Sequence, residues 1–184
     1  RCMERHRPGQ IFSPPLLSEN QAMHRLAALP GDPGEGDAVL VEQESLPALV
    51  LSHADSDLSL IAQRLSAAGD PAWMRGLNLA ALSHPAAIDH YIRSSLASTR
   101  LVVVRLLGGR GHWSYGLEQL REWAAQSPQR ALLVLGGTAD GAEELADLSS
   151  EPATTALALA SCLRHGGPDN IDAVLLWCQR WLAG

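Results

Sequence analysis

Apolar residues are distributed along the chain in two patterns that alternate with one another. In three short runs nearly every residue is apolar, as in strands buried on both faces: PALVLSHA at 47–54, LVVVRLL at 101–107 and ALLVLGG at 131–137. Elsewhere apolar residues recur every three or four positions, which predicts amphipathic helices. These helices are expected at 58–69, 83–96, 113–124, 142–148, 150–166 and 168–182. The passage that contains Trp73 and Asn78 follows neither pattern.

The segment 83–96 shows how sharply some of these helices are marked. Ser83 is a favourable cap residue, and Pro85 fits the first turn, where no backbone N–H is needed. Ile88, Ile92 and Leu96 then fall on one face. A helix is therefore expected to begin at Ser83.

The alternation of apolar strands with helices predicts an α/β fold. A parallel sheet with helices on both faces, in a three-layer flavodoxin-like or Rossmann-like layout, is the architecture that this order favours. The last two helices have no strand between them, so they are expected to pack on the sheet or to form an appendage. Residues 1–36 are interpreted as a flexible lead-in, because they end in the loop PGDPGEGD, and 37–184 as a single domain.

Composition and charge exclude several classes of function. The net charge is −6, which disfavours nucleic acid or an anionic membrane as the main partner. The chain has 14 arginines and no lysine, so the common ATPase and Schiff-base sites that depend on lysine are excluded. No apolar run is long enough to span a membrane, and 1–22 lacks the core of a secretory signal. Cys162 and Cys178 are interpreted as buried free thiols, and a cytoplasmic location is expected.

Polar residues collect directly after each predicted strand. In a parallel sheet these positions share the carboxyl edge, where ligands of α/β proteins bind. Three loops, SHADSD at 52–57, RLLGGRGHW at 105–113 and GGTADG at 136–141, are expected there. Their candidate residues are His53, Asp55, Asp57, Arg105, Gly108, Gly109, Arg110, His112, Thr138 and Asp140.

An ordinary structural interpretation of this edge stays open beside a functional one. Asp55 or Ser56 could cap the following helix, and the glycines could serve only to permit positive φ. Arg105 lies inside an apolar run, where an unpaired charge is costly. Either it forms an internal ion pair with Asp55 or Asp57, or it binds an anion.

Motifs of known catalytic sites are absent from the sequence. There is no G-x-G-x-x-G, H-E-x-x-H, G-x-S-x-G or C-x-x-C, and the loose H-x-D-x-D of HADSD is a weak metal motif. DSDLS is similar to the start of dehalogenase-like phosphatases, but the later lysine and acidic pair of those enzymes are missing. We assign no catalytic residue and no metal site.

Several phrases together resemble one family. MHRLAALPGD, LVLSHADSDLSLIAQRL, LVVVRLLGGRGHWSYGLEQL, ALLVLGGTADGAEELADLSSEPA and LRHGGPDNIDAVLLWCQRWLAG are similar, in this order, to the amino-terminal region of the cobaltochelatase large subunit, the CobN family, which is related to the H subunit of magnesium chelatase. The resemblance covers about 23–184 and favours Met23 as the natural start.

The resemblance implies a function for the whole enzyme and a limited one for this chain. The family inserts Co²⁺ into hydrogenobyrinic acid a,c-diamide in cobalamin biosynthesis, while AAA+ partner subunits hydrolyse ATP. Its insertion chemistry lies mainly beyond the region matched here, so the chain is expected to be inactive alone, to need no cofactor of its own, and to contact the remainder of the large subunit.

Three interpretations of the 105–112 loop follow from the resemblance and the residues together. Arg105 and Arg110 bind carboxylates of the corrinoid precursor, or they fasten the domain to the rest of the large subunit, or Arg105 is paired internally. A hypothesis of another class is a stand-alone α/β module that holds a small anion at this loop. Asp55, Asp57, Gly108, Gly109 and His112 complete the candidate set.

Overall fold

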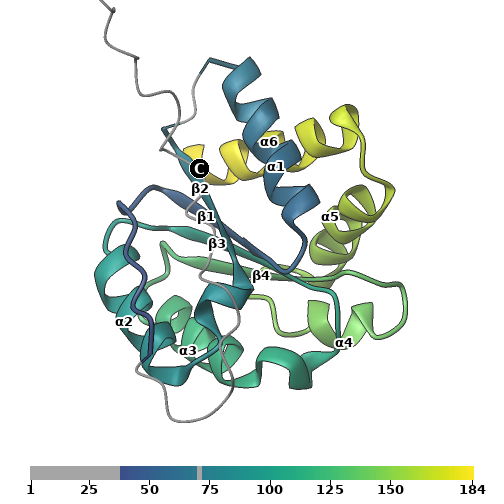
Figure 1. Cartoon of the computed structure of the whole chain (residues 1–184). Helices are drawn as coiled ribbons and strands as arrows, with labels where there is room; N and C mark the ends of the chain where they lie inside the picture. The colour runs from purple at the N-terminus through teal and green to yellow at the C-terminus, as the bar shows by residue number, and fades with distance from the viewer. Residues whose placement is uncertain (1–37, 70–71) are drawn as a thin grey trace, which may run out of the picture.

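The computed structural model of the chain describes residues 38–69 and 72–184, and it contains a four-stranded parallel sheet in the order β2-β1-β3-β4 (Figure 1). The strands are β1 (Ala48–Ser52), β2 (Met74–Asn78), β3 (Leu101–Leu106) and β4 (Ala131–Gly136). Their ends are nearly flush, because Ser52 at the end of β1 lies beside Asn78 of β2 and Arg105 of β3. The polar loops therefore begin at one common edge.

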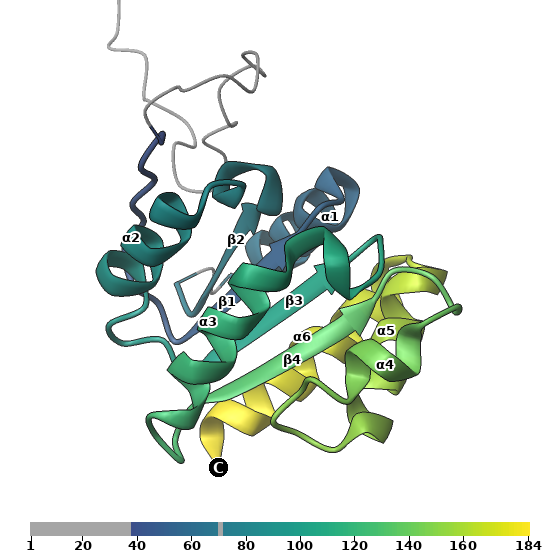
Figure 2. The same cartoon turned by 90° about the horizontal axis from the view of Figure 1, so that it is seen from below.

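Helices cover both faces of the sheet. One face carries α1 (Asp55–Ala67), α5 (Ala153–His165) and α6 (Pro168–Ala183). The other carries α2 (Pro85–Ser95), α3 (Ser114–Ala125) and the 3₁₀ turn η1 (Leu79–Leu82). The short helix α4 (Ala142–Ala146) lies beside β4 at the edge of the sheet (Figure 2). The predicted three-layer α/β fold is confirmed, and the last two helices pack on the sheet.

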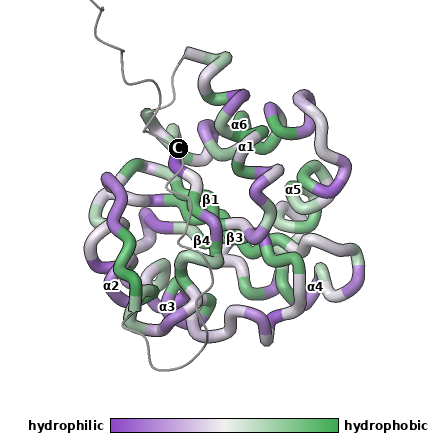
Figure 3. Tube along the Cα trace, viewed as in Figure 1, coloured by the Kyte–Doolittle hydropathy of each residue, from purple (hydrophilic) through white to green (hydrophobic). Residues whose placement is uncertain are grey.

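Successive residues of each strand supply the two halves of the core. Leu101 and Val103 pack with α1, α5 and α6, whereas Val102 and Val104 pack with α2 and α3. All four are at most 1% exposed. This two-sided burial explains why β3 and β4 have almost uninterrupted apolar sequences, and the hydrophobic colour gathers along the strands in Figure 3.

The strand β2 was missed by the sequence pattern. Its sequence, MRGLN, places Arg75 and Gly76 in the middle of an edge strand, so neither alternation nor an apolar run is visible. Arg75 is paired with Glu44, and the amide of Gln43 donates to the carbonyl of Gly76. The segment before β1 thus accommodates the polar positions of this strand.

Two local predictions were wrong. Helix α2 is capped by His84 and not by Ser83: the His84 Nδ1 accepts a hydrogen bond of 3.1 Å from the Ala86 N–H. Of the two cysteines expected to be buried, Cys178 is fully buried and Cys162 is only partly so. Burial raises the pKa of the Cys178 thiol to about 12.

No helix in 38–69 or 72–184 is long and apolar enough to cross a membrane. The predicted lead-in, 1–36, lies outside the described residues, and the boundary at 36–37 stays a prediction.

The strand order creates a reversal point between β1 and β3. Helix α1 connects β1 to β2 on one face, and α2 then connects β2 to β3 on the opposite face. The order 2-1-3-4 is that of the first four strands of flavodoxin-like sheets, whose ligands bind at this switch point. The loops that follow β1 and β3 therefore lie at this switch point.

The free edge of β4 is covered by a short segment after α4. The Leu132 N–H donates to the Ser150 Oγ at 2.8 Å, and the Val134 N–H donates to the Ser149 Oγ at 2.9 Å. The Ser150 N–H in turn donates to the Leu132 carbonyl at 2.8 Å. These bonds satisfy backbone groups of β4 that would otherwise be free to pair with a strand of another chain.

Replacing Ser150 by alanine removes the acceptor of the buried Leu132 amide. We expect Ser150→Ala to lower the free energy of unfolding by about 1–3 kcal/mol, since an orphaned buried donor keeps its desolvation cost. Urea denaturation measures this change. The control Ser66→Ala, at an exposed position of α1, should stay within about 0.5 kcal/mol of the parent. Equal stabilities of the two variants would show that the serine hydroxyl does not protect the β4 edge.

Candidate functional site at the carboxyl edge of the sheet

A buried ion pair joins β3 to α1 at the switch point. The Arg105 Nη1 is paired with the Asp57 Oδ2, and the two side chains are only 8% and 12% exposed. The Ser52 Oγ donates to the same carboxylate oxygen at 3.0 Å and accepts from the Ala54 N–H at 3.0 Å. Asp57 thus receives a cation from β3 and a hydroxyl from β1.

The position of Asp57 explains why the carboxylate is there. It lies in the first turn of α1, where the helix dipole favours a negative charge. Arg105 points toward the α1 face, as Leu101 and Val103 do. Of the two roles that the sequence left open for Arg105, the structure shows the internal ion pair, with Asp57 as the partner. The Arg105 Nε is buried and makes no hydrogen bond.

Asp55 links the ends of β1 and β2. Its Oδ1 accepts a hydrogen bond of 2.6 Å from the Asn78 side-chain amide, and the Asn78 Oδ1 accepts one of 2.8 Å from the Ala80 N–H. The prediction that Asp55 or Ser56 caps α1 was wrong: the cap position is Ala54, and no side chain caps the helix there.

Of the three glycines in the turn after β3, only Gly108 has a close steric neighbour, and none has positive φ. Gly108, Gly109 and Gly111 do not have positive φ, so the prediction was wrong for this turn, whereas Gly141 in the loop after β4 does have positive φ. A Cβ on Gly108 would lie 2.2 Å from the His112 Cδ2, because the imidazole folds back over this residue. Gly109 and Gly111 have open space around them.

Trp113 fixes the far end of the same turn, which forms the 3₁₀ helix η2 (Arg110–Trp113). Its indole Nε1 donates a buried hydrogen bond of 2.8 Å to the carbonyl of Leu82, at the end of η1. The ring occupies the space beside Gly116, where a Cβ would lie 2.2 Å from it. The turn is thereby anchored to the loop that follows β2.

The remaining cationic groups of the turn face solvent. Arg110 and His112 are exposed, and Arg110 makes no hydrogen bond or ion pair within the described part of the chain. His53, after β1, is half-buried; burial and the neighbouring charge of His112 lower its pKa.

The loop after β4 is held to β3 by its backbone. The Gly137 N–H donates to the Leu106 carbonyl at 2.7 Å, and the Thr138 hydroxyl donates to the Asp140 carbonyl at 3.1 Å within the turn. Arg164 of α5 reaches the carbonyl of Gly136 at 3.4 Å. Thr138 and Asp140 are thus placed at the predicted edge but are not joined to Arg105 or Asp57.

Four residues of this edge were missed by sequence reasoning. Ser52 and Asn78 are the last residues of β1 and β2. A polar residue at the end of a strand is the one sequence signal that could have identified them as site residues. Trp113 was read as part of a helix face, and Arg164 lies in the last turn of a helix far along the sequence. Within 38–69 and 72–184 no three His, Cys, Asp or Glu side chains converge to hold a metal, so the H-x-D-x-D residues do not form a ligand set.

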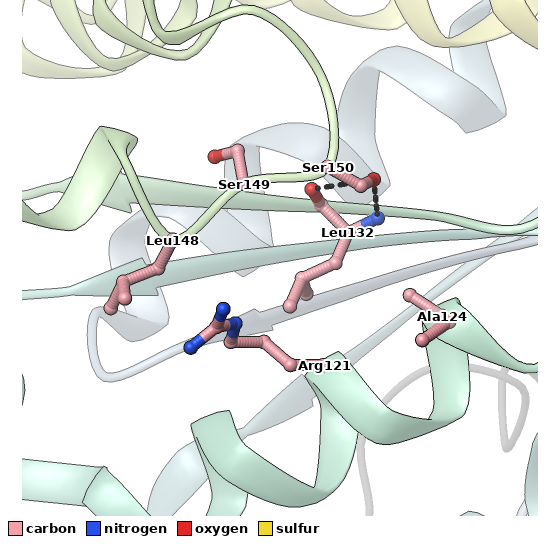
Figure 4. A pocket seen from close by; sticks show the side chains of 7 residues that line it. Arg121, Ala124, Leu132, Leu148, Ser149 and Ser150 are labelled. Carbon is pink, nitrogen blue, oxygen red and sulfur yellow. Dashed lines mark hydrogen bonds between the residues drawn. The ribbon is translucent and has the colours of Figure 1, made fainter.

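A shallow hollow of about 200 Å³ lies elsewhere, between α3 and the segment that covers β4. Its lining consists of Arg121, Ala124, Ala125, Leu132, Leu148, Ser149 and Ser150. Figure 4 shows Arg121 reaching across it from α3. None of the residues predicted from the sequence lies in this hollow.

The fold and its carboxyl-edge links define a doubly wound α/β module of flavodoxin-like strand order. No model of a protein family matches the chain. It is 35% identical over 153 residues to the aerobic cobaltochelatase subunit CobN of Pseudomonas aeruginosa, an alignment that covers 80% of this chain and 12% of that protein. The CobN subunit of Sinorhizobium sp. is 31% identical over 168 residues, or 88% of this chain and 13% of the relative.

A solved structure gives the same result. The catalytic subunit of cobaltochelatase from Mycobacterium tuberculosis superposes with a TM-score of 0.51 and 28% identity, over 67% of this chain and 9% of that one. The resemblance to the CobN family of cobaltochelatase large subunits is therefore confirmed. The chain spans about one eighth of the length of the curated relatives that it matches.

Removing one member of the buried Arg105–Asp57 pair should lower the stability of the fold. We expect Arg105→Leu to lower the free energy of unfolding by about 3–5 kcal/mol, because Asp57 would remain as an uncompensated buried charge. The double variant Asp57→Asn/Arg105→Leu should be more stable than Arg105→Leu alone, since no charge is then left unpaired. Urea unfolding of the four members of this cycle measures the coupling.

Arg110→Leu is the matched control, because it removes an exposed arginine of the same turn. It should change stability by no more than about 0.5 kcal/mol. Additive effects of the two substitutions at Asp57 and Arg105 would contradict the coupling.

Proposed function

We propose that the chain provides a non-catalytic α/β module of a cobaltochelatase large subunit. The whole enzyme would insert Co²⁺, as substrate, into hydrogenobyrinic acid a,c-diamide in cobalamin biosynthesis, in the cytoplasm, with ATP hydrolysed on AAA+ partner subunits. The module alone would not carry out insertion; its role would be to shape the tetrapyrrole cavity or the surface that meets the remainder of the subunit.

One observation carries this proposal. Identity of 31–35% extends over 80–88% of the chain but over only 12–13% of the two CobN proteins. Homology that includes nearly all of this chain supports its placement within a cobaltochelatase subunit of this family. The lack of lysine agrees with the placement of ATP hydrolysis on other subunits.

The bonded groups of the carboxyl edge support an architectural role for most of it. Arg105 and Asp57 neutralise each other, and Asp55 is bonded to Asn78. These groups hold loops together, so they are not free to take part in metal insertion. What the edge offers to the rest of the enzyme is the exposed turn with Arg110 and His112.

The proposal is tested in the CobN protein of Pseudomonas aeruginosa. We expect deletion of the segment that this chain matches to reduce cobalt insertion into hydrogenobyrinic acid a,c-diamide to background, in an assay with ATP and the partner subunits. Fusion of this chain in place of the deleted segment should restore insertion, and the chain alone should show none.

Two variants of the fusion serve as controls. Arg121→Ala, at an exposed position of α3, should restore insertion as well as the parent does, whereas Arg105→Leu, which breaks the buried pair, should restore less. Full activity of the deleted enzyme, or cobalt insertion by the chain alone, would refute the modular role.

A further inference from the structure

The segment that precedes β1, residues 38–46, runs beside α2 (Figures 1 and 2). Every second residue from Val41 to Ser45 is partly buried, and Val41 packs against the core between the sheet and α2. The residues between them, Leu40, Glu42 and Glu44, are exposed. A period of two is that of extended backbone with one side against the protein. The segment therefore has the form of a strand, although it pairs with no strand of the described chain.

Buried groups of α2 hold the inward side of this segment. The Tyr91 hydroxyl donates to the Gln43 Oε1 at 2.6 Å, and the Gln43 N–H donates to the Ser95 Oγ at 3.0 Å. Further along, the Ser98 N–H donates to the Ser45 Oγ at 2.8 Å. Burial raises the pKa of the Tyr91 hydroxyl, which therefore remains a donor. The segment is thus fixed in place before any partner binds, which lowers the entropic cost of association.

The backbone of residues 39–42 is left without partners. Within 38–69 and 72–184, none of the N–H and C=O groups of these four residues forms a hydrogen bond. The sequence Val39-Leu40-Val41 is rich in β-branched residues, which favour extended backbone. Extended backbone with unpaired N–H and C=O groups is a template on which a further strand can pair.

Two apolar side chains at the start of the segment lie in solvent. Val39 is 65% exposed and Leu40 is 53% exposed, the two largest values among the exposed large hydrophobic residues of the described ranges. A strand paired with this segment would place its own side chains beside both of them, and apolar cross-strand pairs stabilise such pairing. The feature is therefore an apolar strand edge and not a single exposed residue.

The carboxylates that follow indicate the charge of the partner. One oxygen of Glu42 lies 2.8 Å from the His90 Nε2, and one of Glu44 lies 2.6 Å from the Arg75 Nη2. The two glutamate side chains are still 68% and 75% exposed, so each can meet a further cation. Opposite charges on neighbouring strands stabilise their pairing, whereas like charges weaken it. A basic strand fits this edge better than a second copy of the chain, whose net charge is −6.

We infer that residues 39–44 accept a β-strand from the remainder of the cobaltochelatase large subunit, with apolar side chains beside Val39 and Leu40 and arginine or lysine beside Glu42 and Glu44. The inference rests on the proposed function and deepens it, because it names the surface by which the module meets the rest of the subunit. The region matched by this chain is only 12–13% of the two CobN relatives, so most of such a subunit can supply the strand.

Hydrogen–deuterium exchange tests this inference, because pairing protects backbone amides that are free in the chain alone. Exchange of 39–44 is compared in this chain alone and in the fusion that carries the chain in place of the matched segment of the Pseudomonas aeruginosa CobN protein. We expect the amides of 39–42 to exchange in the chain alone nearly as fast as in an unstructured peptide, and at least about tenfold more slowly in the fusion. The Gln43 amide, which is bonded to Ser95, should be protected in both proteins.

A charge on the outward side of the segment should prevent the pairing. Leu40→Lys leaves the inward contacts in place, and a lysine on a strand edge opposes the approach of another strand, above all of a basic one. We expect this variant of the fusion to lose the protection of 39–42. Leu176→Lys is the matched control, because it makes the same change at a leucine of α6 that is 46% exposed, and it should keep the protection.

The possible results separate the strand contact from the modular role. Equal exchange of 39–42 in the chain and in the fusion, or equal loss of protection in both lysine variants, would overturn the inference. Protection in the chain alone that grows with its concentration, together with a dimer in analytical ultracentrifugation, would assign the strand to a second copy and also overturn it. Cobalt insertion by the same fusion is measured in parallel: insertion without protection refutes only the strand contact, and protection without insertion refutes only the modular role.

Discussion

The ion pair between Arg105 and Asp57 is the constraint on which the arrangement of the carboxyl edge depends. An arginine within a strand that is otherwise fully buried must have its charge compensated, since removal from water costs several kcal/mol per ion. The first turn of α1 is the place where a carboxylate can meet it, and Ser52 steadies that carboxylate from β1. The pair therefore fixes the start of α1 against β3 and sets the distance between the loops on either side of the reversal point.

Other links extend this constraint to every strand. Asp55 connects the end of β1 to Asn78 of β2, and Trp113 connects the turn after β3 to the carbonyl at the end of η1. The Gly137 N–H connects the loop after β4 to β3. The Arg105–Asp57 pair and the Trp113 indole N–H are buried and would be costly to leave unpaired, whereas the Asp55–Asn78 bond is exposed. Together these links connect the residues at the carboxyl ends of all four strands.

The fold could be predicted from the sequence where burial is two-sided, and not where one side is open. β3 and β4 are central or covered, and their apolar runs were unmistakable; β2 is an edge strand whose Arg75 and Gly76 depend on contacts from the segment before β1. The preference for serine as a helix cap also gave the wrong residue at α2, because the His84 imidazole caps the helix in place of Ser83.

The site was predictable in its location and only partly in its contacts. Strand ends of a parallel sheet share an edge, so the three polar loops could be placed together from the sequence alone. Which carboxylate would pair with Arg105 could not be derived, because Asp55 and Asp57 differ only by their place on the first turn of α1. The partner of Trp113, the Leu82 carbonyl, lies 31 residues away, and no sequence pattern points to it.

Arg105, at the end of β3, and Arg110, in the turn that follows, have opposite roles for a physical reason. Arg105 is on a strand with its side chain directed beneath α1, so its charge must be met from within the protein, and it cannot be spared for a partner without exposing Asp57. Arg110 lies on an exposed turn, where an unpaired guanidinium costs little. The same fold thus uses one arginine to build the edge and leaves the other in solvent.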